Sequence, residues 1–132
     1  MMKPKINFIT LAVADLKKAK AFYQNAFNFP VTDETDILCL FSLADDFSLA
    51  LEERSAFLEQ AGAQNPEATS AGFILSHRAH SLEEVNQIVK RAEAAGANRV
   101  KTTDEDWGYS IILTDPDGHH WEIVYLVNAV NV

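Results

Sequence analysis

The sequence predicts an α+β protein in which one order of strands and helix occurs twice. Three observations support this prediction: a strand-like segment precedes an amphipathic helix near residue 15, the same order returns near residue 81, and turn-forming residues separate the short apolar segments after each helix. A repeat of this kind places both helices on one face of a mixed sheet. Because 132 residues suffice for one domain but not for two ordinary ones, we expect a single domain, residues 1–132, with modules at about 1–62 and 70–128.

The first module begins with residues 6–13, whose β-branched and aromatic side chains predict a strand. Asp15 follows as the N-cap of a helix that ends before Pro30. Apolar residues three and four positions apart form one face of this helix: Leu16, Ala19, Phe22, Tyr23, Ala26 and Phe27. Two further apolar segments, 37–43 and 47–52, are separated by a short polar turn and predict a hairpin.

A short helix at residues 54–61 and a polar connection at 64–70 lead into the second module, which opens with a strand at 72–78. Ser81 and Glu84 have the spacing of a capping box, in which the serine hydroxyl accepts from the amide three residues on and the glutamate reaches back. The helix that follows carries its apolar residues on one face: Val85, Ile88, Val89, Ala92 and Ala95.

Gly96 is a natural stop for this helix. Three strand-like segments come after it, at residues 99–102, 108–114 and 119–127. Between the last two lies Asp115-Pro116-Asp117-Gly118, a strong turn signal in which proline presets the backbone of the second turn position. The second module therefore ends in a predicted hairpin.

The composition excludes several classes of function. The formal net charge of −8 argues against nucleic acid, since a phosphate-binding protein needs a basic face, and it argues equally against an anionic membrane surface. No segment approaches the roughly 18 apolar residues of a membrane helix. Cys39 is the only cysteine, and its apolar neighbours predict a buried, inert thiol. We expect a cytoplasmic protein without nucleic-acid or membrane partners.

Segments spread over nearly the whole chain resemble the vicinal oxygen chelate superfamily, the group of glyoxalases and bleomycin-resistance proteins. They are residues 8–16 and 21–23, 75–77, 81–85 and 94–97, and 107–109 and 115–122. The Asp-Pro-Asp-Gly turn alone is simply a good turn, but its conjunction with Glu122 and the first-module pattern is more specific. The resemblance implies two βαβββ modules forming an eight-stranded, open U-shaped barrel, a cup with helices on its outer face, and a homodimer.

The resemblance also implies where a metal would bind. In metal-dependent relatives, four strands facing the cup each supply one ligand, and a divalent ion polarises a substrate with neighbouring oxygens. The corresponding positions here are Phe8, Ala50, Ile74 and Glu122, and a bulge near the third would bring Ser76 or His77 into its place. Because phenylalanine and alanine cannot bind a divalent cation, we predict neither a metal site nor a cofactor.

Glu122 is the strongest candidate for chemistry. If Trp121 and Ile123 occupy one face of their strand, Glu122 and His120 share the other. Glu122 is then either a general base or acid acting beside a carbonyl, or a carboxylate satisfied by a buried hydrogen bond. His77 is the candidate partner in an acid–base couple with Glu122, with a purely structural bond as the alternative.

The candidate ligand pocket consists of Phe8, Thr10, Trp107, Tyr109 and His120. The alternative is that the aromatic residues fill the core and that the histidine lies partly exposed at an edge. The resemblance places residues 107–109 at the mouth of the cup. Relatives often carry two glycines after the tryptophan, whereas this chain has only Gly108. Arg78 is a candidate for recognising an anionic ligand, or else a solvated arginine.

Three hypotheses for the function follow. The first is a metal-free protein that binds a small organic molecule, in the manner of bleomycin-resistance proteins; an acidic chain suits a cationic ligand anchored by Glu122. The second is a lyase or isomerase resembling glyoxalase I, with Glu122 as general base. The third is a non-enzymatic interaction module whose cup is collapsed by Phe8 and its neighbours.

Overall fold

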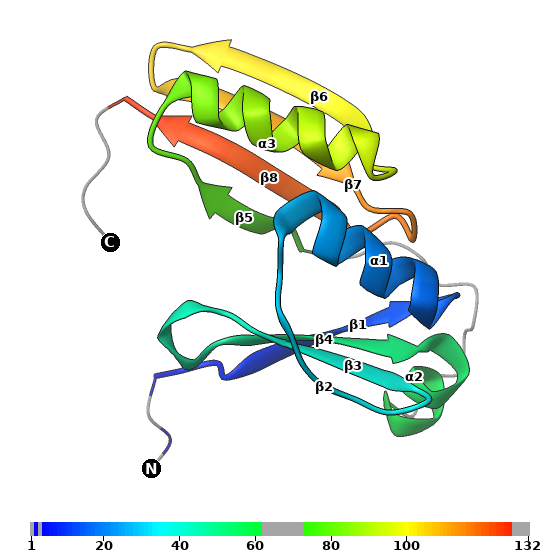
Figure 1. The fold of residues 1–132 in the computed structure, drawn as a ribbon. Coiled ribbons are helices and arrows are strands. Elements are labelled where there is room, and N and C mark those ends of the chain that lie inside the picture. Colours follow the sequence, from blue (N-terminus) through cyan, green and yellow to red (C-terminus); the bar gives the residue numbers. More distant parts are fainter. Residues whose placement is uncertain (1, 3, 62–72, 128–132) are drawn as a thin grey trace. The chain divides into compact units, whose positions relative to one another are not determined.

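The computed structural model describes residues 2, 4–61 and 73–127, which divide into two compact units, Met1–Ala68 and Thr69–Val132 (Figure 1). The elements of the first unit are β1 (Phe8–Val13), α1 (Leu16–Phe27), β2 (Val31–Glu34), β3 (Leu38–Ser42), a 3-10 turn (Ala44–Asp46), β4 (Ser48–Glu53) and α2 (Arg54–Ala61). Those of the second are β5 (Leu75–Arg78), α3 (Leu82–Ala94), β6 (Asn98–Glu105), β7 (Gly108–Thr114) and β8 (His120–Leu126). None of the helices in the described residues has the length and apolar character needed to span a membrane.

Each unit contains one four-stranded mixed sheet. The strand order is β1-β4-β3-β2 in the first sheet and β5-β8-β7-β6 in the second. In both, the first strand pairs in parallel with the last, and the remaining pairs are antiparallel. Neither sheet closes on itself. The predicted α+β class and the repeated βαβββ module are confirmed.

Helix α1 covers one face of the first sheet. Asp15 caps it as predicted, with its side chain accepting from the amide of Lys18 (3.1 Å), and Asn28 ends it in the left-handed conformation (φ 57°). Its buried residues include Tyr23, whose ring centroid lies 6.0 Å from that of Phe41 on β3. The alternate strand residues on this face of the sheet are buried as well: Leu11, Val13, Cys39, Leu49 and Leu51. The prediction of a buried Cys39 is confirmed.

Helix α2 packs against β1 and β4 on the opposite face of the same sheet. The side-chain amide of Gln60 on α2 lies beside the Glu52 carboxylate. Hydrogen-bond complementarity assigns the amide nitrogen to this side, where it donates to both carboxylate oxygens (2.6 and 3.1 Å). Glu52 faces away from Leu51 and is only 7% exposed. Part of this face is therefore closed by a helix and holds a buried carboxylate, which the sequence analysis did not single out.

Helix α3 covers one face of the second sheet, packing on β7 and β8. The Ser81 hydroxyl accepts from the amide of Glu84 (3.0 Å) as predicted, while the returning bond joins the Glu84 carboxylate to the amide of His80 (3.2 Å), one residue earlier than expected. The Tyr109 hydroxyl donates to the side-chain oxygen of Asn86 on α3 (3.1 Å). Because Tyr109 points toward the helix, Ile111 and Leu113 do so too, and both are fully buried.

The turn between β7 and β8 is built around Asp115, as the sequence predicted. One carboxylate oxygen accepts from the amides of Asp117 (2.9 Å) and His119 (2.8 Å), and the other lies 2.8 Å from Nδ1 of His119. Asp115 is 2% exposed, and Gly118 has a positive φ of 88° that suits glycine. His119 is therefore structural.

The edge strands β2 and β6 differ most from the sequence predictions. β2 was not predicted, because only Val31 of its four residues is apolar, and its pairing with β3 comes from backbone bonds at an exposed edge. β6 extends over eight residues, where the sequence indicated only 99–102, and seven of the eight are exposed. Edge strands receive their conformation from the neighbouring strand, so a hydrophobic pattern does not reveal them.

Candidate functional site

Glu122 lies in the interior of β8, a central strand of the second sheet. Its sequence neighbours Trp121 and Ile123 are buried on the α3 side, being 7% and 1% exposed. Successive side chains of a strand alternate, so Glu122 points to the face away from α3. The predicted alternation along this strand is confirmed. Across the sheet, Glu122 stands opposite Ser76 of β5 and Ile112 of β7.

Two serine hydroxyls donate to the Glu122 carboxylate. The Ser76 hydroxyl lies 2.9 Å from Oε1, and the Ser110 hydroxyl lies 2.9 Å from Oε2. Ser110 is buried (4% exposed), Ser76 is exposed, and Glu122 is half-buried between them. We call these three residues the Glu122 cluster. An ionised carboxylate has about four acceptor sites, so the serines orient the group and leave acceptor capacity toward solvent.

Other polar residues share this face of the second sheet. His120 begins β8 two residues before Glu122, is half-buried, and stands opposite Thr114 of β7. Arg78 ends β5 two residues after Ser76, is half-buried, and stands opposite Val124 of β8. We call this surface the Glu122 face; it contains Ser76, Arg78, Ser110, His120, Glu122 and Val124. The expectation that His120 and Glu122 share a face is met.

The structure does not bring His77 and Glu122 together. His77 stands opposite Ile123, so its side chain lies on the α3 side of the sheet, and it is exposed. Tyr109 lies on that side too, bonded to Asn86. The hypothesis of a His77–Glu122 acid–base couple is therefore wrong for this sheet. Trp107 precedes β7 in the β6–β7 turn and is 48% exposed, with its carbonyl accepting from the amide of Val127 (3.0 Å).

The candidates of the first unit lie on the face of their sheet that α1 does not cover. Phe8 begins β1, is 59% exposed and stands opposite Ser48. Thr10 is half-buried and stands opposite Ala50, as Ser76 stands opposite Glu122 in the second unit. Ala50 is thus the equivalent of Glu122. The residues that stand opposite these two positions are Thr10 and Ser76. The resemblance had placed the other two metal-ligand positions at Phe8 and Ile74.

Glu52 is a buried carboxylate that the sequence analysis did not single out. It lies two residues beyond Ala50 on the same face of β4, stands opposite Ala12 of β1, and binds Gln60 of α2. The signal was present in the alternation of β4, where Leu49 and Leu51 take the α1 face and leave Glu52 on the other. The missing information was that a helix covers this end of the strand.

The residues present do not fit the divalent metal that the family implies. In the first sheet, Thr10 and Ala50 at the paired positions offer at most one hydroxyl. In the second, Glu122 stands opposite a serine, and both of its oxygens accept from hydroxyls. Within residues 2, 4–61 and 73–127, no group of three or more His, Cys, Asp or Glu side chains could hold a metal ion. A divalent site needs several such ligands in one shell.

Solved structures of related fold match most of the chain. A glyoxalase-related enzyme from Fulvimarina pelagi is 24% identical with a TM-score of 0.85, over 93% of this chain and 88% of that one. The fosfomycin resistance protein FosX from Listeria monocytogenes is 24% identical with a TM-score of 0.73, over 94% of each chain. Lactoylglutathione lyase from Agrobacterium tumefaciens is 21% identical with a TM-score of 0.70, over 93% and 94%. At these identities the likeness establishes the fold.

The family model described as Glyoxalase/Bleomycin resistance protein/Dioxygenase superfamily matches residues 5–123, nearly the whole chain. The match includes both βαβββ modules up to Ile123 and contains the complete Glu122 cluster. The chain therefore belongs to the glyoxalase/bleomycin resistance protein/dioxygenase superfamily.

Proposed function

We propose that this protein binds a small organic molecule at the Glu122 face without a metal ion, in the manner of bleomycin-resistance proteins. The observation that carries the proposal is the pair of serine hydroxyls on the Glu122 carboxylate. Two hydroxyl donors hold the carboxylate in one orientation. A ligand that presents an ammonium or another N–H group then meets an acceptor that is already in place.

The chemistry of the cluster favours a cationic ligand. Preorganisation matters because a free glutamate side chain loses rotamer freedom when it is ordered, which weakens binding. Ser110 and Ser76 reduce that loss from the two sides of β8. The net charge of −8 adds a long-range attraction for cations, which raises association rates at low ionic strength.

A lyase or isomerase that uses Glu122 as general base is the second candidate. The favouring observation is the same fixed carboxylate, in a fold shared with a lactoylglutathione lyase. Proton abstraction beside a carbonyl needs a base within hydrogen-bond reach of the substrate proton and a group that stabilises the developing charge. His77 lies on the far side of the sheet and does not supply that group.

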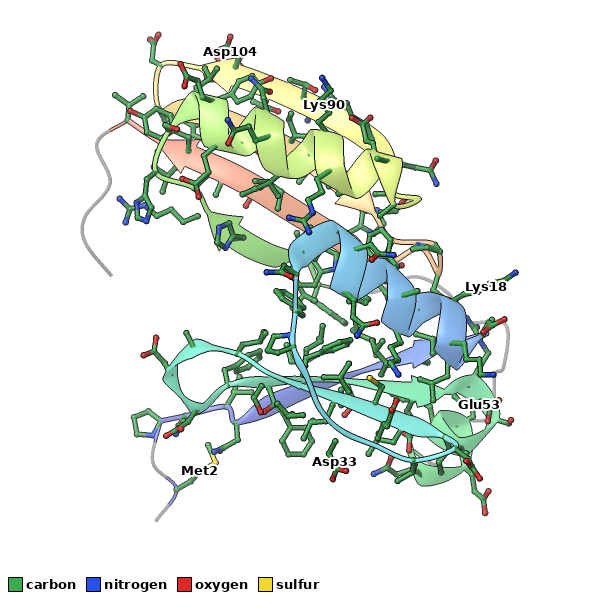
Figure 2. All side chains as sticks on the ribbon, viewed as in Figure 1. Met2, Lys18, Asp33, Glu53, Lys90 and Asp104 are labelled. Atoms are coloured by element: carbon green, nitrogen blue, oxygen red, sulfur yellow. The ribbon has the colours of Figure 1, made fainter. Side chains whose placement is uncertain are left out.

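The test is titration of isotope-labelled protein with small amines, followed by amide chemical shifts, for the wild type and for Glu122→Gln, Ser110→Ala and Asp104→Asn. Asp104 on exposed β6 (Figure 2) is the matched control, since its substitution also removes one negative charge. We expect Glu122→Gln to weaken amine binding at least tenfold and Ser110→Ala to weaken it about threefold, with Asp104→Asn unchanged.

The outcomes separate the hypotheses. Unchanged amine affinity in Glu122→Gln overturns the binding proposal. If Glu122→Gln loses turnover of an α-hydroxycarbonyl or thioester substrate but retains ligand affinity, the result supports the lyase hypothesis instead. Binding of no small molecule favours the non-enzymatic interaction module. We also expect a homodimer located in the cytoplasm, and light scattering on the purified protein would then give twice the chain mass of 14.7 kDa.

A further inference from the structure

Arg78 places a positive charge on the same face as the Glu122 carboxylate. Ser76 and Arg78 are two residues apart on β5, so both side chains point to one side of the sheet. Ser76 stands opposite Glu122, and Arg78 stands opposite Val124, one step further along β8. The guanidinium and the carboxylate therefore rise from neighbouring strands, offset by two residues.

The two residues are separated along the sheet as well as across it. With strands about 4.8 Å apart and a rise of about 3.3 Å per residue, the Cα atoms of Arg78 and Glu122 are separated by about 8 Å. The hydrogen bonds of Glu122 go to the hydroxyls of Ser76 and Ser110. A small molecule that carries both charges itself can meet both side chains from this face of the sheet.

The charge of Arg78 is screened less by solvent than the charge of a surface lysine. Arg78 is half-buried, and Val124 opposite it is 7% exposed. Partial burial lowers screening by solvent and salt. A guanidinium is also a planar group that can bind a carboxylate through two parallel bonds, which an ammonium cannot do. Lys101 lies on the same face, opposite Ile112, but on the exposed edge strand β6.

We propose that the ligand of the Glu122 face is a zwitterion, an amine that also carries a carboxylate, and that Arg78 is the residue selecting for the anionic group. This inference rests on the proposed function, because Glu122 must hold the ammonium. The ammonium lies at the serine-bound carboxylate, the ligand carboxylate lies at the Arg78 guanidinium, and the ligand side chain lies against Ile112.

The test compares molecules that differ only in charge. Two matched sets serve as probes: phenylalanine, phenethylamine and 3-phenylpropanoate, and alanine, ethylamine and propanoate. Affinities come from amide chemical shifts of labelled protein at low salt. In the wild type we expect at least one zwitterion to bind about tenfold more tightly than its amine, and the anions to bind most weakly.

The variants assign the effect to Arg78. We expect Arg78→Gln to reduce zwitterion affinity about tenfold, to the level of the amine, with amine affinity within twofold of wild type. Arg78→Lys should retain part of the preference, since it keeps the charge but loses the planar guanidinium. Lys101→Gln is the matched control and should leave the preference intact. Thermal midpoints within about 2 °C of wild type confirm that the variants are folded.

Three results overturn the inference. If neither zwitterion binds more tightly than its amine, no anion subsite exists. If Arg78→Gln keeps the preference, or Lys101→Gln loses it, Arg78 is not the selecting residue. In each of these cases amine binding that depends on Glu122 leaves the proposed function standing. Zwitterion and amine binding that is indifferent to Glu122→Gln removes the proposed function itself.

Discussion

The two sheets have the same strand order and the same parallel pairing, yet their carboxylates lie at different positions. In the second sheet, Glu122 stands opposite Ser76 and accepts two serine hydroxyls. In the first sheet, Thr10 and Ala50 hold the equivalent pair of positions, and the carboxylate appears two residues later as Glu52.

The partners of the two carboxylates differ as well. Glu52 is bound by the amide of Gln60 from α2, which packs against its strands, and only 7% of it is exposed. Glu122 is half-buried and held by hydroxyls that leave acceptor capacity. A repeated backbone therefore does not repeat a site, because the chemistry depends on which alternate position of the strand carries the charge and on what covers it.

Moving the carboxylate in the first sheet to the position that it has in the second gives the largest expected effect. Ala50 is 3% exposed, so Ala50→Glu inserts both volume and charge into a closed region. We expect a loss of about 3 kcal/mol of unfolding free energy, measured by urea denaturation. Ala50→Gln adds a similar volume without the charge, and it should lose less unfolding free energy. An Ala50→Glu variant as stable as wild type would mean that both sheets tolerate a carboxylate at this position of the strand.

A separate measurement on the wild type tests the metal prediction. We expect none of the ions nickel, zinc, manganese and iron(II) to bind, so the thermal midpoint of the wild type with each of them should stay within about 1 °C of the metal-free value. A bound ion would raise the midpoint, because a ligand that binds the native state raises its stability by mass action. A larger rise with one ion, or a stoichiometric metal in the purified protein, would contradict the ligand positions inferred here.

Removing the partner of Glu52 should have a smaller effect. Gln60→Ala leaves a buried carboxylate without its amide donor, and we expect a loss of about 1 kcal/mol of unfolding free energy. The same substitution at exposed Gln87 of α3 is the control and should change the unfolding free energy by less than about 0.5 kcal/mol. Equal effects of the two substitutions would mean that the amide does not stabilise Glu52, and the contrast between the sheets would then rest on burial alone.

The smallest effect concerns the start of α2. The hydroxyl and amide of Ser55, with the amide of Ala56, hold the pKa of the Glu53 carboxyl below its ordinary value of 4.5. A lowered folded-state pKa adds stability that is present above the unfolded value and disappears as pH falls through the folded value. Glu53→Gln should therefore lower the thermal midpoint slightly at pH 7 and leave it unchanged near pH 3.

Glu59→Gln, on the exposed side of the same helix, is the control for a general change of net charge. If the Glu59 and Glu53 variants show the same pH dependence, the hydrogen bonds at the start of α2 do not stabilise the folded state. Glu53 lies in the first unit and Lys90 in the second (Figure 2). Lys90→Gln therefore serves as a further control, for a change of charge outside the first sheet.

Local signals in the sequence were sufficient for much of the fold. Asp15 and Ser81 cap their helices as predicted, and Asp115 organises the predicted turn. These features depend on bonds between residues two to four positions apart, so the chain carries them without reference to the sheet. β2 was missed for the converse reason, since its exposed residues take strand conformation from β3.

The candidate site was predicted only in part. Alternation along β8 correctly separated Glu122 from Trp121 and Ile123, because the period of a strand is local. The sequence alone determined this much: a repeated order of strand, helix and further strands, its caps and turns, and a carboxylate on the face opposite the buried one. The register of β5 against β8 came only from the tertiary structure, since pairing of distant strands depends on packing and not on local spacing.

That register decided the chemistry. A shift of one residue would have placed His77 opposite Glu122, and the observed pairing places Ser76 there, so a hydroxyl-bound acceptor replaces an acid–base couple. The packing of α2 likewise decided that Glu52 is buried against Gln60. The partners of Glu122 and Glu52 both depend on the tertiary structure. Hydrogen bonds between residues 46 positions apart, or between a helix and a strand face, form only when the sheet has assembled.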